Sequence, residues 1–146
     1  METRRLPSWL PAMNRVMKFL QRVGIVIGPI QVLTIPGRTS GKPRTTPVSP
    51  LTVGDRHYVV AALPQADWAR NIRVAGCGEL ARGRVRRPVV LNEVEDPDTK
   101  RAVMAAFPRE VPGGVPFFVH LGLVERADPA QFVAASDRVA IFEIRS

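Results

Sequence analysis

The chain has 146 residues, of which 45% are hydrophobic and 23% charged, and its formal net charge is +8. This length fits a single domain, and the composition is that of a globular chain with enough apolar residues for a core, which excludes general disorder. Cys77 is the only cysteine; this excludes an internal disulfide, disfavours a cysteine-based metal site and suits a reducing cytoplasm. The positive charge favours anionic ligands such as nucleic acid, acidic lipid or a phosphorylated cofactor.

The first 22 residues are expected to form a helical extension ahead of a single domain at residues 23–146. Residues 12–22 fit an amphipathic helix whose apolar face consists of Met13, Val16, Met17 and Leu20. Two roles stay open for this helix: packing on the domain or on a second copy, and peripheral contact with an acidic membrane surface. The apolar stretch at residues 23–30 is shorter than the roughly 20 residues of a membrane span. We therefore expect a cytoplasmic protein, with membrane association through the helix left open.

Strand-like stretches dominate the middle of the chain. Residues 30–35, 45–53 and 56–63 are rich in β-branched and apolar residues, which predicts three strands. Gly54 and Asp55 separate the last two and predict a hairpin. A second hairpin is predicted over residues 78–95 around Gly83, and residues 138–144 are expected to form the final strand.

Helical signals lie between and after these strands. Trp68, Ile72 and Ala75 are spaced one helical turn apart, Gly76 is a natural terminator, and Asp67 is predicted to cap the helix through its carboxylate.

The dipeptide Asp-Pro then predicts two further helix starts, each with an aspartate N-cap followed by proline: Asp96-Pro97 and Asp128-Pro129. Hairpins with short helices between them predict an α+β domain built on a small, mostly antiparallel barrel. The βαβ alternation and the GxGxxG motif of a Rossmann domain are missing.

Motifs for chemistry carried by the protein itself are also missing. The sequence has no GxSxG, no HExxH and no Cys–His arrangement. His57 and His120 are far apart and fit no metal-ligand spacing, so no metal is expected. An enzyme with this sequence would take its reactivity from a cofactor.

The stretch at residues 36–47, PGRTSGKPRTTP, is the strongest candidate for binding such a cofactor. Gly37 and Gly41 allow positive φ, so that successive N–H groups can converge on an anion. Arg38 and Arg44 can add charge-assisted hydrogen bonds. The alternative is an ordinary hairpin turn with solvated charges.

The segment DWARN at residues 67–71 is a second candidate. On a helix, Asp67, Arg70 and Asn71 share one face. One interpretation is a capped helix with Trp68 as a core anchor and Arg70 in a surface ion pair. The other directs the helix N-terminus at a phosphate or a ring carbonyl.

Three stretches in this order, GRTSGKPRTTPVSPL, GDRHYVVAAL and DWARNIRVAG, resemble the deazaflavin-dependent nitroreductase family. The agreement is strong over residues 33–82 and weaker up to the last strand. The resemblance implies a split β-barrel of the FMN-binding type with short peripheral helices. It further implies an oxidoreductase that binds reduced coenzyme F-420, a deazaflavin, and transfers hydride to an enone, a quinone or a nitro compound. A homodimer is implied as well.

The resemblance also implies which residues bind the cofactor, in four groups. The clamp for the phosphate and the polyglutamate tail comprises Arg38, Thr39, Ser40 and Arg44. The strand beside the deazaflavin comprises Thr45, Thr46, Pro47 and Val48. The second strand lining the ring contributes Ala61, Ala62 and Leu63. The helix that closes the site contributes Asp67, Trp68, Ala69, Arg70 and Asn71.

The sequence departs from the family pattern in two places. Thr39 stands where lysine is common, and the only tyrosine is Tyr58, so tyrosines on the substrate side are missing. No catalytic side chain is assigned. Candidates for the substrate side, with core packing as the alternative for the three phenylalanines, are Phe107, Phe117, Phe118 and His120.

Three rival functions remain. The first is an FMN-dependent oxidoreductase on the same fold, and the second is a carrier that binds F-420 without turnover. The third is nucleic-acid binding through the arginines of one hairpin, Arg82, Arg84, Arg86 and Arg87. That hairpin has no interleaved aromatic residues, which leaves only phosphate attraction and disfavours nucleic acid as a partner.

Overall fold

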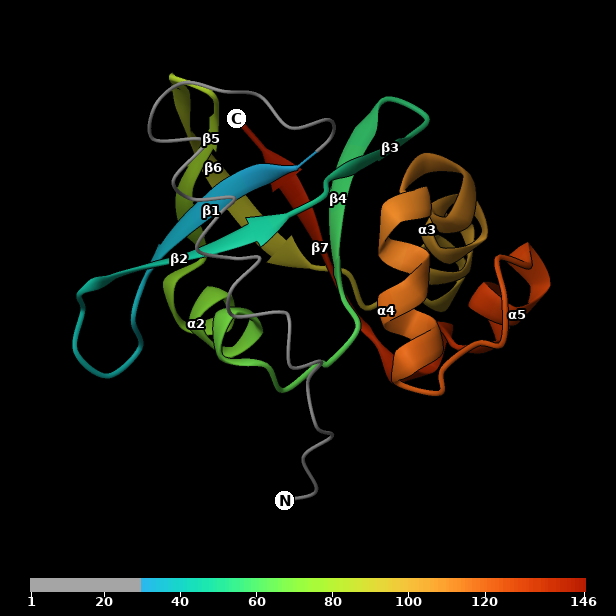
Figure 1. Ribbon diagram of the computed structural model, residues 1–146. Coiled ribbons are helices and arrows are strands. Elements are labelled where there is room, and N and C mark those ends of the chain that lie inside the picture. The colour runs from blue at the N-terminus through green and yellow to red at the C-terminus, as the bar shows by residue number, and fades with distance from the viewer. Residues whose placement is uncertain (1–29) are drawn as a thin grey trace.

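The computed structural model describes residues 30–146 (Figure 1). The expected helical extension at residues 1–22, and residues 23–29 of the expected domain, lie outside the described residues. The described part contains one seven-stranded sheet with the strand order β2-β1-β5-β6-β7-β4-β3. The strands are β1 (Gln31–Pro36), β2 (Pro43–Val48), β3 (Leu51–Val53), β4 (Arg56–Ala61), β5 (Cys77–Arg82), β6 (Val85–Glu93) and β7 (Ala140–Arg145).

The sheet is curled because its two edges are joined by a very short connection. β2 and β3 lie at opposite edges in the hydrogen-bonding order, yet only Ser49 and Pro50 separate them in sequence. Three residue steps span at most about 11 Å, so the two edges must approach each other there. All strand pairs are antiparallel, and the result is the predicted split barrel in an α+β domain.

The predicted single strand over residues 45–53 is therefore wrong. The chain leaves the sheet at Ser49 and Pro50 and re-enters it at the other edge. Proline has no N–H to donate to a strand ladder, so a break at this position costs little. Both predicted hairpins are confirmed, as β3–β4 and β5–β6. The final strand begins at Ala140, two residues later than predicted, because Ser136–Arg138 forms a 3-10 turn.

Side chains from the concave face of the sheet form the first core, together with one helix. The helix α2 (Asp67–Ala75) packs against β1, β5 and β6 and lies at the lower left in Figure 1. Ala69 and Ile72 of α2 join Leu33, Ile35 and Phe142 in this core. The spacing of the apolar residues in α2 therefore serves burial on the barrel.

A second core lies on the other side of β3 and β4, where three helices pack (Figure 1). These helices are α3 (Pro97–Glu110), α4 (Val115–His120) and α5 (Pro129–Ala134). Both predicted aspartate caps are confirmed: Asp96 Oδ2 accepts from Thr99 N at 3.0 Å, and Asp128 Oδ1 accepts from Ala130 N at 3.0 Å. Within residues 30–146, no helix is long and apolar enough to cross a membrane.

Candidate functional site

The loop between β1 and β2 is closed by its own hydrogen bonds. Gly37 N donates to Lys42 O at 2.8 Å, and Gly41 N donates to Gly37 O at 2.9 Å. Lys42 N donates to the hydroxyl oxygen of Ser40 at 3.1 Å. Gly41 has φ +74°, a conformation that L side chains rarely adopt. Gly41 thus has the positive φ that the sequence allowed, whereas Gly37 does not. The expected convergence of N–H groups on an anion is a wrong prediction for Gly37, Gly41 and Lys42, because their N–H groups are bonded within the loop.

Arg38 connects this loop to α2. The Oδ1 atom of Asn71 accepts from Arg38 N at 3.0 Å and from Arg38 Nη1 at 2.9 Å. Arg38 Nη2 also lies 3.2 Å from Asp67 Oδ1. The side chain of Asp67 is 87% exposed, whereas Asn71 is only 4% exposed. The structure therefore brings together three residues that the sequence assigned to one site.

The start and end of α2 show which local signals decide its position. Its N-cap is Ala66, and no side chain caps the helix. The prediction that Asp67 caps α2 is therefore wrong, because Asp67 is the first helical residue and its carboxylate turns to Arg38 instead. Gly76 ends the helix as predicted, with φ 70° and its N–H bonded to Ile72 O at 2.8 Å. Trp68 packs against Phe142 with ring centroids 6.3 Å apart.

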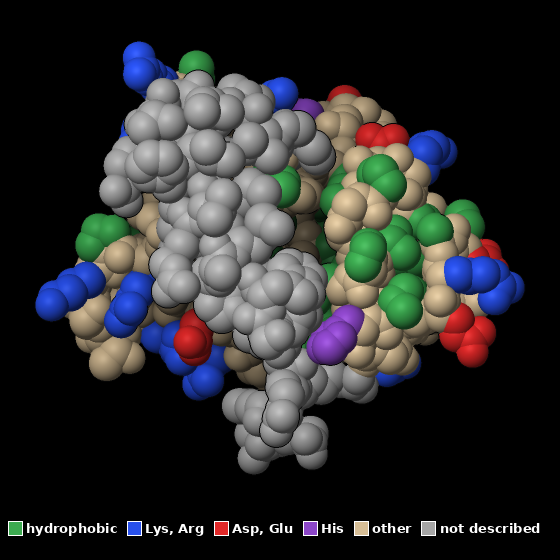
Figure 2. Space-filling view, viewed as in Figure 1, with side chains coloured by type: hydrophobic (Ala, Val, Ile, Leu, Met, Phe, Trp, Pro, Cys, Tyr) green, Lys and Arg blue, Asp and Glu red, His purple; other side chains and the backbone are tan. Residues whose placement is uncertain are grey.

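The remaining cations around the loop carry no counter-ion from the part of the chain that the structure describes. Among residues 30–146, Lys42, Arg44 and Arg70 form neither an ion pair nor a side-chain hydrogen bond. Asp67 neutralises only Arg38, so the surroundings of the loop stay strongly positive. In Figure 2, Lys and Arg side chains gather at the lower left, over the β1–β2 loop and α2. An anion that reaches this surface would meet several unpaired cations.

The other predicted cofactor residues of this region lie in the β1–β2 loop and along β2. Thr39, Ser40 and Thr45 are exposed, Thr46 and Pro47 are half-buried, and Val48 is buried in the barrel core. Along this segment the side chains thus change from polar and exposed near the loop to apolar and buried at Val48, the last residue of β2.

The segment at the end of β4 points into both cores. Ala61 is 1% exposed and belongs to the barrel core. Ala62 is 8% exposed and belongs to the helical core, against which Leu63 is partly buried. Ala69 is also fully buried, inside the barrel core. The side chains of these three alanines are therefore packed in the cores.

The phenylalanines proposed for the substrate side mainly pack in the helical core. Phe107 and Phe118 are buried, with ring centroids 4.8 Å apart, and both rings also contact Phe132. Phe117 is partly buried against the same core, and His120 is exposed at the end of α4. Core packing, the alternative weighed for these phenylalanines, is what the structure shows for Phe107 and Phe118.

One interaction that orients α2 was missed by the sequence analysis. Arg73 Nε and Nη2 donate to the two carboxylate oxygens of Glu93 at 2.8 and 3.1 Å, and Nη1 donates to Pro64 O at 2.7 Å. The hydrogen bond from Arg73 lowers the pKa of the Glu93 carboxyl, and the same bond raises the pKa of Arg73. Because the two residues are 20 positions apart, no local pattern indicates this bidentate pair.

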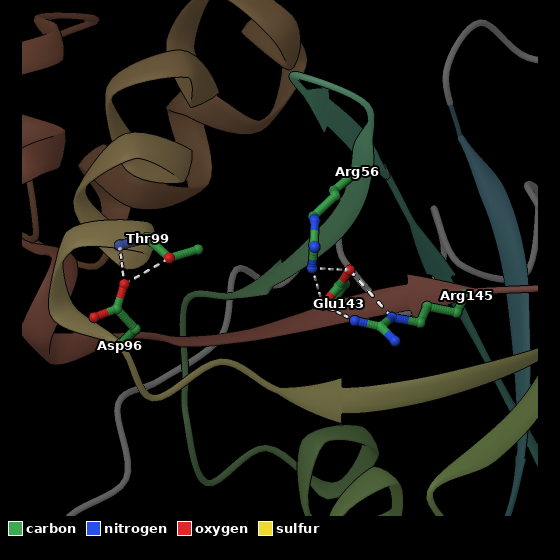
Figure 3. A network of polar contacts seen from close by, with 5 residues as sticks. All are labelled: Arg56, Asp96, Thr99, Glu143 and Arg145. Atoms are coloured by element: carbon green, nitrogen blue, oxygen red, sulfur yellow. Dashed lines mark hydrogen bonds and ion pairs between the residues drawn. The ribbon is translucent and has the colours of Figure 1, made fainter.

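Two shallow grooves lie elsewhere on the surface, near the C-terminal end of β7 and the start of α3. Their volumes are about 400 and 330 Å³, and both are lined by Arg56 and Glu143. Glu143 pairs with Arg56 at 3.2 Å and with Arg145 at 3.3 Å, close to the Asp96 cap (Figure 3). Neither groove is lined by the loop or by α2.

Two other features concern metal binding and the rival function of nucleic-acid binding. Among residues 30–146, no three acidic, histidine or cysteine side chains are placed to hold a metal ion. In the arginine-rich hairpin, Arg86 pairs with Glu79 at 3.2 Å, and Arg87 donates to the Ser146 hydroxyl at 2.9 Å. Part of the hairpin's charge is therefore already engaged within the chain.

A curled antiparallel barrel with a cationic glycine loop defines a class, the split β-barrel proteins. Three solved structures share the fold. A domain-swapped dimer is 19% identical, with a TM-score of 0.58, covering 94% of this chain and 97% of that one. An F420-H2 dependent reductase, FDR-A, is 20% identical, with a TM-score of 0.55 and coverages of 82% and 97%. A conserved hypothetical protein from Mycobacterium tuberculosis is 13% identical, with a TM-score of 0.53 and coverages of 98% and 86%.

The sequence itself narrows this class to one family. Residues 12–113 match the family described as F420H(2)-dependent quinone reductase. No curated protein matches the chain in sequence. Because the family match covers most of the chain, the chain belongs to this family and is an F420-dependent oxidoreductase, as the resemblance implied.

Proposed function

We propose that the chain holds reduced coenzyme F-420 between the β1–β2 loop and α2 and reduces an electrophilic organic substrate there. When bound, the coenzyme supplies a hydride from C5 of its deazaflavin ring. Of the three substrate classes implied by the sequence, the family description favours a quinone over an enone or a nitro compound. The observation that carries the proposal is the set of unpaired cations around the closed glycine loop.

The donor chemistry of this loop fits the coenzyme. F-420 has a phosphate and a carboxylate-rich tail, and both bind well to guanidinium and ammonium groups. Among the cations of the β1–β2 loop, β2 and α2, Lys42, Arg44 and Arg70 have no counter-ion within the described residues. The exposed hydroxyls of Thr39 and Thr45 lie on the same loop and strand. We assign the anionic groups of the coenzyme to these residues and to Arg38, which also holds the loop against α2.

The half-buried residues near the sheet edges are assigned to the ring. Thr46 and Pro47 on β2, and Leu63 after β4, combine apolar surface with partial exposure. The side chains of Ala61 and Ala62 are buried in the cores, so a ring would meet that segment through its backbone. In this proposal the chain orients the ring, excludes water on one side and supplies hydrogen bonds, and none of its side chains forms a covalent bond.

A fluorescence titration with F-420 tests this proposal. Arg44→Ala removes one unpaired guanidinium, and a charge-assisted hydrogen bond is worth about 1.5–3 kcal/mol, so we expect the Kd to rise about tenfold or more. Arg138→Ala is the matched control, because Arg138 is also exposed but lies in a 3-10 turn between α5 and β7. An equal effect of both substitutions, or no binding of F-420, contradicts the proposal.

Two further measurements separate the rivals. Tight binding of FMN without binding of F-420 would favour the FMN-dependent alternative. Binding of F-420 without turnover of quinones, enones or nitroaromatics would favour the carrier alternative. The proposal predicts F-420 binding together with substrate-dependent oxidation of the reduced coenzyme, fastest with a quinone.

We also propose that the chain forms a homodimer. The support is the domain-swapped dimer among its structural relatives and the exposed apolar side chains of the β6 strand, Val85 at 71% and Val90 at 45% exposure. Light scattering at several concentrations tests this, and a monomer at every concentration would refute it.

A further inference from the structure

The partners of Arg38 suggest distinct roles for Asn71 and Asp67. We propose that both are positioning residues that act on the anionic ligand through Arg38, without contacting the ligand themselves. Asn71 locks the β1–β2 loop onto α2, and Asp67 serves as the internal counter-ion of Arg38. The inference rests on the proposed function for the identity of the ligand, but the loop lock itself can be tested on the protein alone.

The amide oxygen of Asn71 is saturated by Arg38. An amide oxygen has two lone pairs, and this one accepts both the backbone N–H and the Nη1–H of Arg38, at 3.0 and 2.9 Å. Asn71 is 4% exposed and one of two buried polar residues in the described part of the chain. Both lone pairs of the oxygen are therefore used by Arg38, and the position of Asn71 inside the fold suits a lock.

The lock fixes more than one side chain. Arg38 directly follows Gly37, whose N–H and C=O close the loop to Lys42 and Gly41. A bond to the backbone N–H of Arg38 therefore sets the orientation of the whole loop relative to α2. Since α2 also carries Arg70, the same bond sets the spacing between the cations of the loop and the cation of the helix. Pre-organised donors bind an anion better than mobile ones because less ordering is needed.

The position of Asp67 suits a counter-ion. Its side chain is 87% exposed, and its distance of 3.2 Å to Arg38 is that of a surface ion pair. Such pairs add little to stability. The carboxylate nevertheless places one negative charge beside a loop otherwise rich in cations. An anionic ligand is repelled by this charge and competes with it for Arg38 Nη2, so Asp67 weakens anion binding.

The first experiment needs no ligand and measures hydrogen exchange at the Arg38 amide in the full chain. Asn71→Ala removes the acceptor, and we expect this amide to exchange at least about tenfold faster. Asn71→Asp retains an acceptor oxygen and is expected to restore most of the protection. Asn92→Ala is the matched control, because Asn92 is exposed on β6. Unchanged exchange in a folded Asn71→Ala variant, or equally faster exchange in Asn92→Ala, overturns the lock.

The second experiment is a double-mutant cycle on F-420 affinity. Arg38→Ala removes the Nη1 bond to Asn71 but keeps the backbone bond, so if Asn71 acts through Arg38, the double variant Arg38→Ala with Asn71→Ala binds F-420 better than the product of the two single effects on Kd predicts. If Asn71 contacts the ligand itself, the two effects on Kd multiply, and the positioning role is refuted. Circular dichroism of each variant verifies that the fold is retained.

The third experiment concerns Asp67. Asp67→Asn is expected to tighten F-420 binding about two- to fivefold at low salt, and less at high salt because the ion pair is exposed. Asp98→Asn is the matched control: Asp98 is 86% exposed and pairs with Arg101 on α3. Weaker binding by Asp67→Asn would identify Asp67 as a ligand contact and refute its role as counter-ion. Should wild type bind no F-420, the proposed function fails, and the exchange experiment alone then decides the lock.

Discussion

The bidentate pair between Arg73 and Glu93 attaches α2 to β6 of the barrel. The two side chains are 29% and 35% exposed, so their attraction should lie between the 0–1 kcal/mol of exposed pairs and the 3–5 kcal/mol lost on breaking buried ones. After a discount for solvent screening, the pair is expected to contribute about 1–1.5 kcal/mol to the free energy of unfolding. The bond to Pro64 O adds about 1 kcal/mol. The guanidinium carbon also lies 5.7 Å from the centroid of Phe142, which adds about 0.5 kcal/mol.

Arg73→Ala is therefore expected to lower the free energy of unfolding by about 3 kcal/mol. Urea unfolding of wild type, Arg73→Ala, Glu93→Ala and the double variant isolates the pair, with an expected coupling of about 1–1.5 kcal/mol. Arg86 and Glu79 form a more exposed pair, 60% and 43% exposed, and serve as the control cycle, with an expected coupling below about 0.5 kcal/mol.

The coupling should depend on pH in a defined direction. The pKa of Glu93 in the folded chain is lowered from its ordinary value of 4.5 by the hydrogen bond from Arg73. The stabilisation is thus fully present above pH 4.5 and is lost as the pH falls through the folded-state pKa. A coupling near zero at pH 7, or one that persists unchanged in acid where the protein is still folded, would refute this reasoning.

Three further substitutions test the packing that supports the site. Gly78→Ala should lower the free energy of urea unfolding by at least about 2 kcal/mol, because a Cβ there would lie 2.5 Å from Thr34 O. In the control Gly113→Ala, the new Cβ meets no atom within 4 Å, so its free energy of unfolding should hardly change. Gly76→Ala should cost about 1 kcal/mol, because φ is +70° at the end of α2; an unchanged unfolding midpoint would contradict this. Phe132→Ala removes a side chain with 0% exposure and should cost about 3–5 kcal/mol; a loss below 1 kcal/mol would mean that the aromatic cluster is not a core.

Local sequence signals predicted much of this fold. The hairpin at Gly54 and Asp55, the caps at Asp96 and Asp128 and the helix end at Gly76 each depend on neighbouring residues alone. Such features are decided by backbone conformation and short-range hydrogen bonds, which the sequence displays directly.

The errors arose where distant segments decide the outcome. The stretch over residues 45–53 has strand character throughout, but the closure of the barrel breaks it at Ser49 and Pro50. Asp67 is a good capping residue, but Arg38, 29 positions away, binds its carboxylate. The bond from Arg38 to Asn71 spans 33 positions. Local pattern showed that these residues belong to one region, and only the fold showed which of them are already engaged with each other.

The central claim is that the coenzyme binds at the β1–β2 loop and α2. Amide chemical shifts of the full chain, recorded during a titration with F-420, test it most directly. The account predicts that the largest changes cluster at residues 37–46 and 66–71. Changes clustered instead around Arg56 and Glu143, which line both grooves, and Arg145, which lines the larger one, would contradict it.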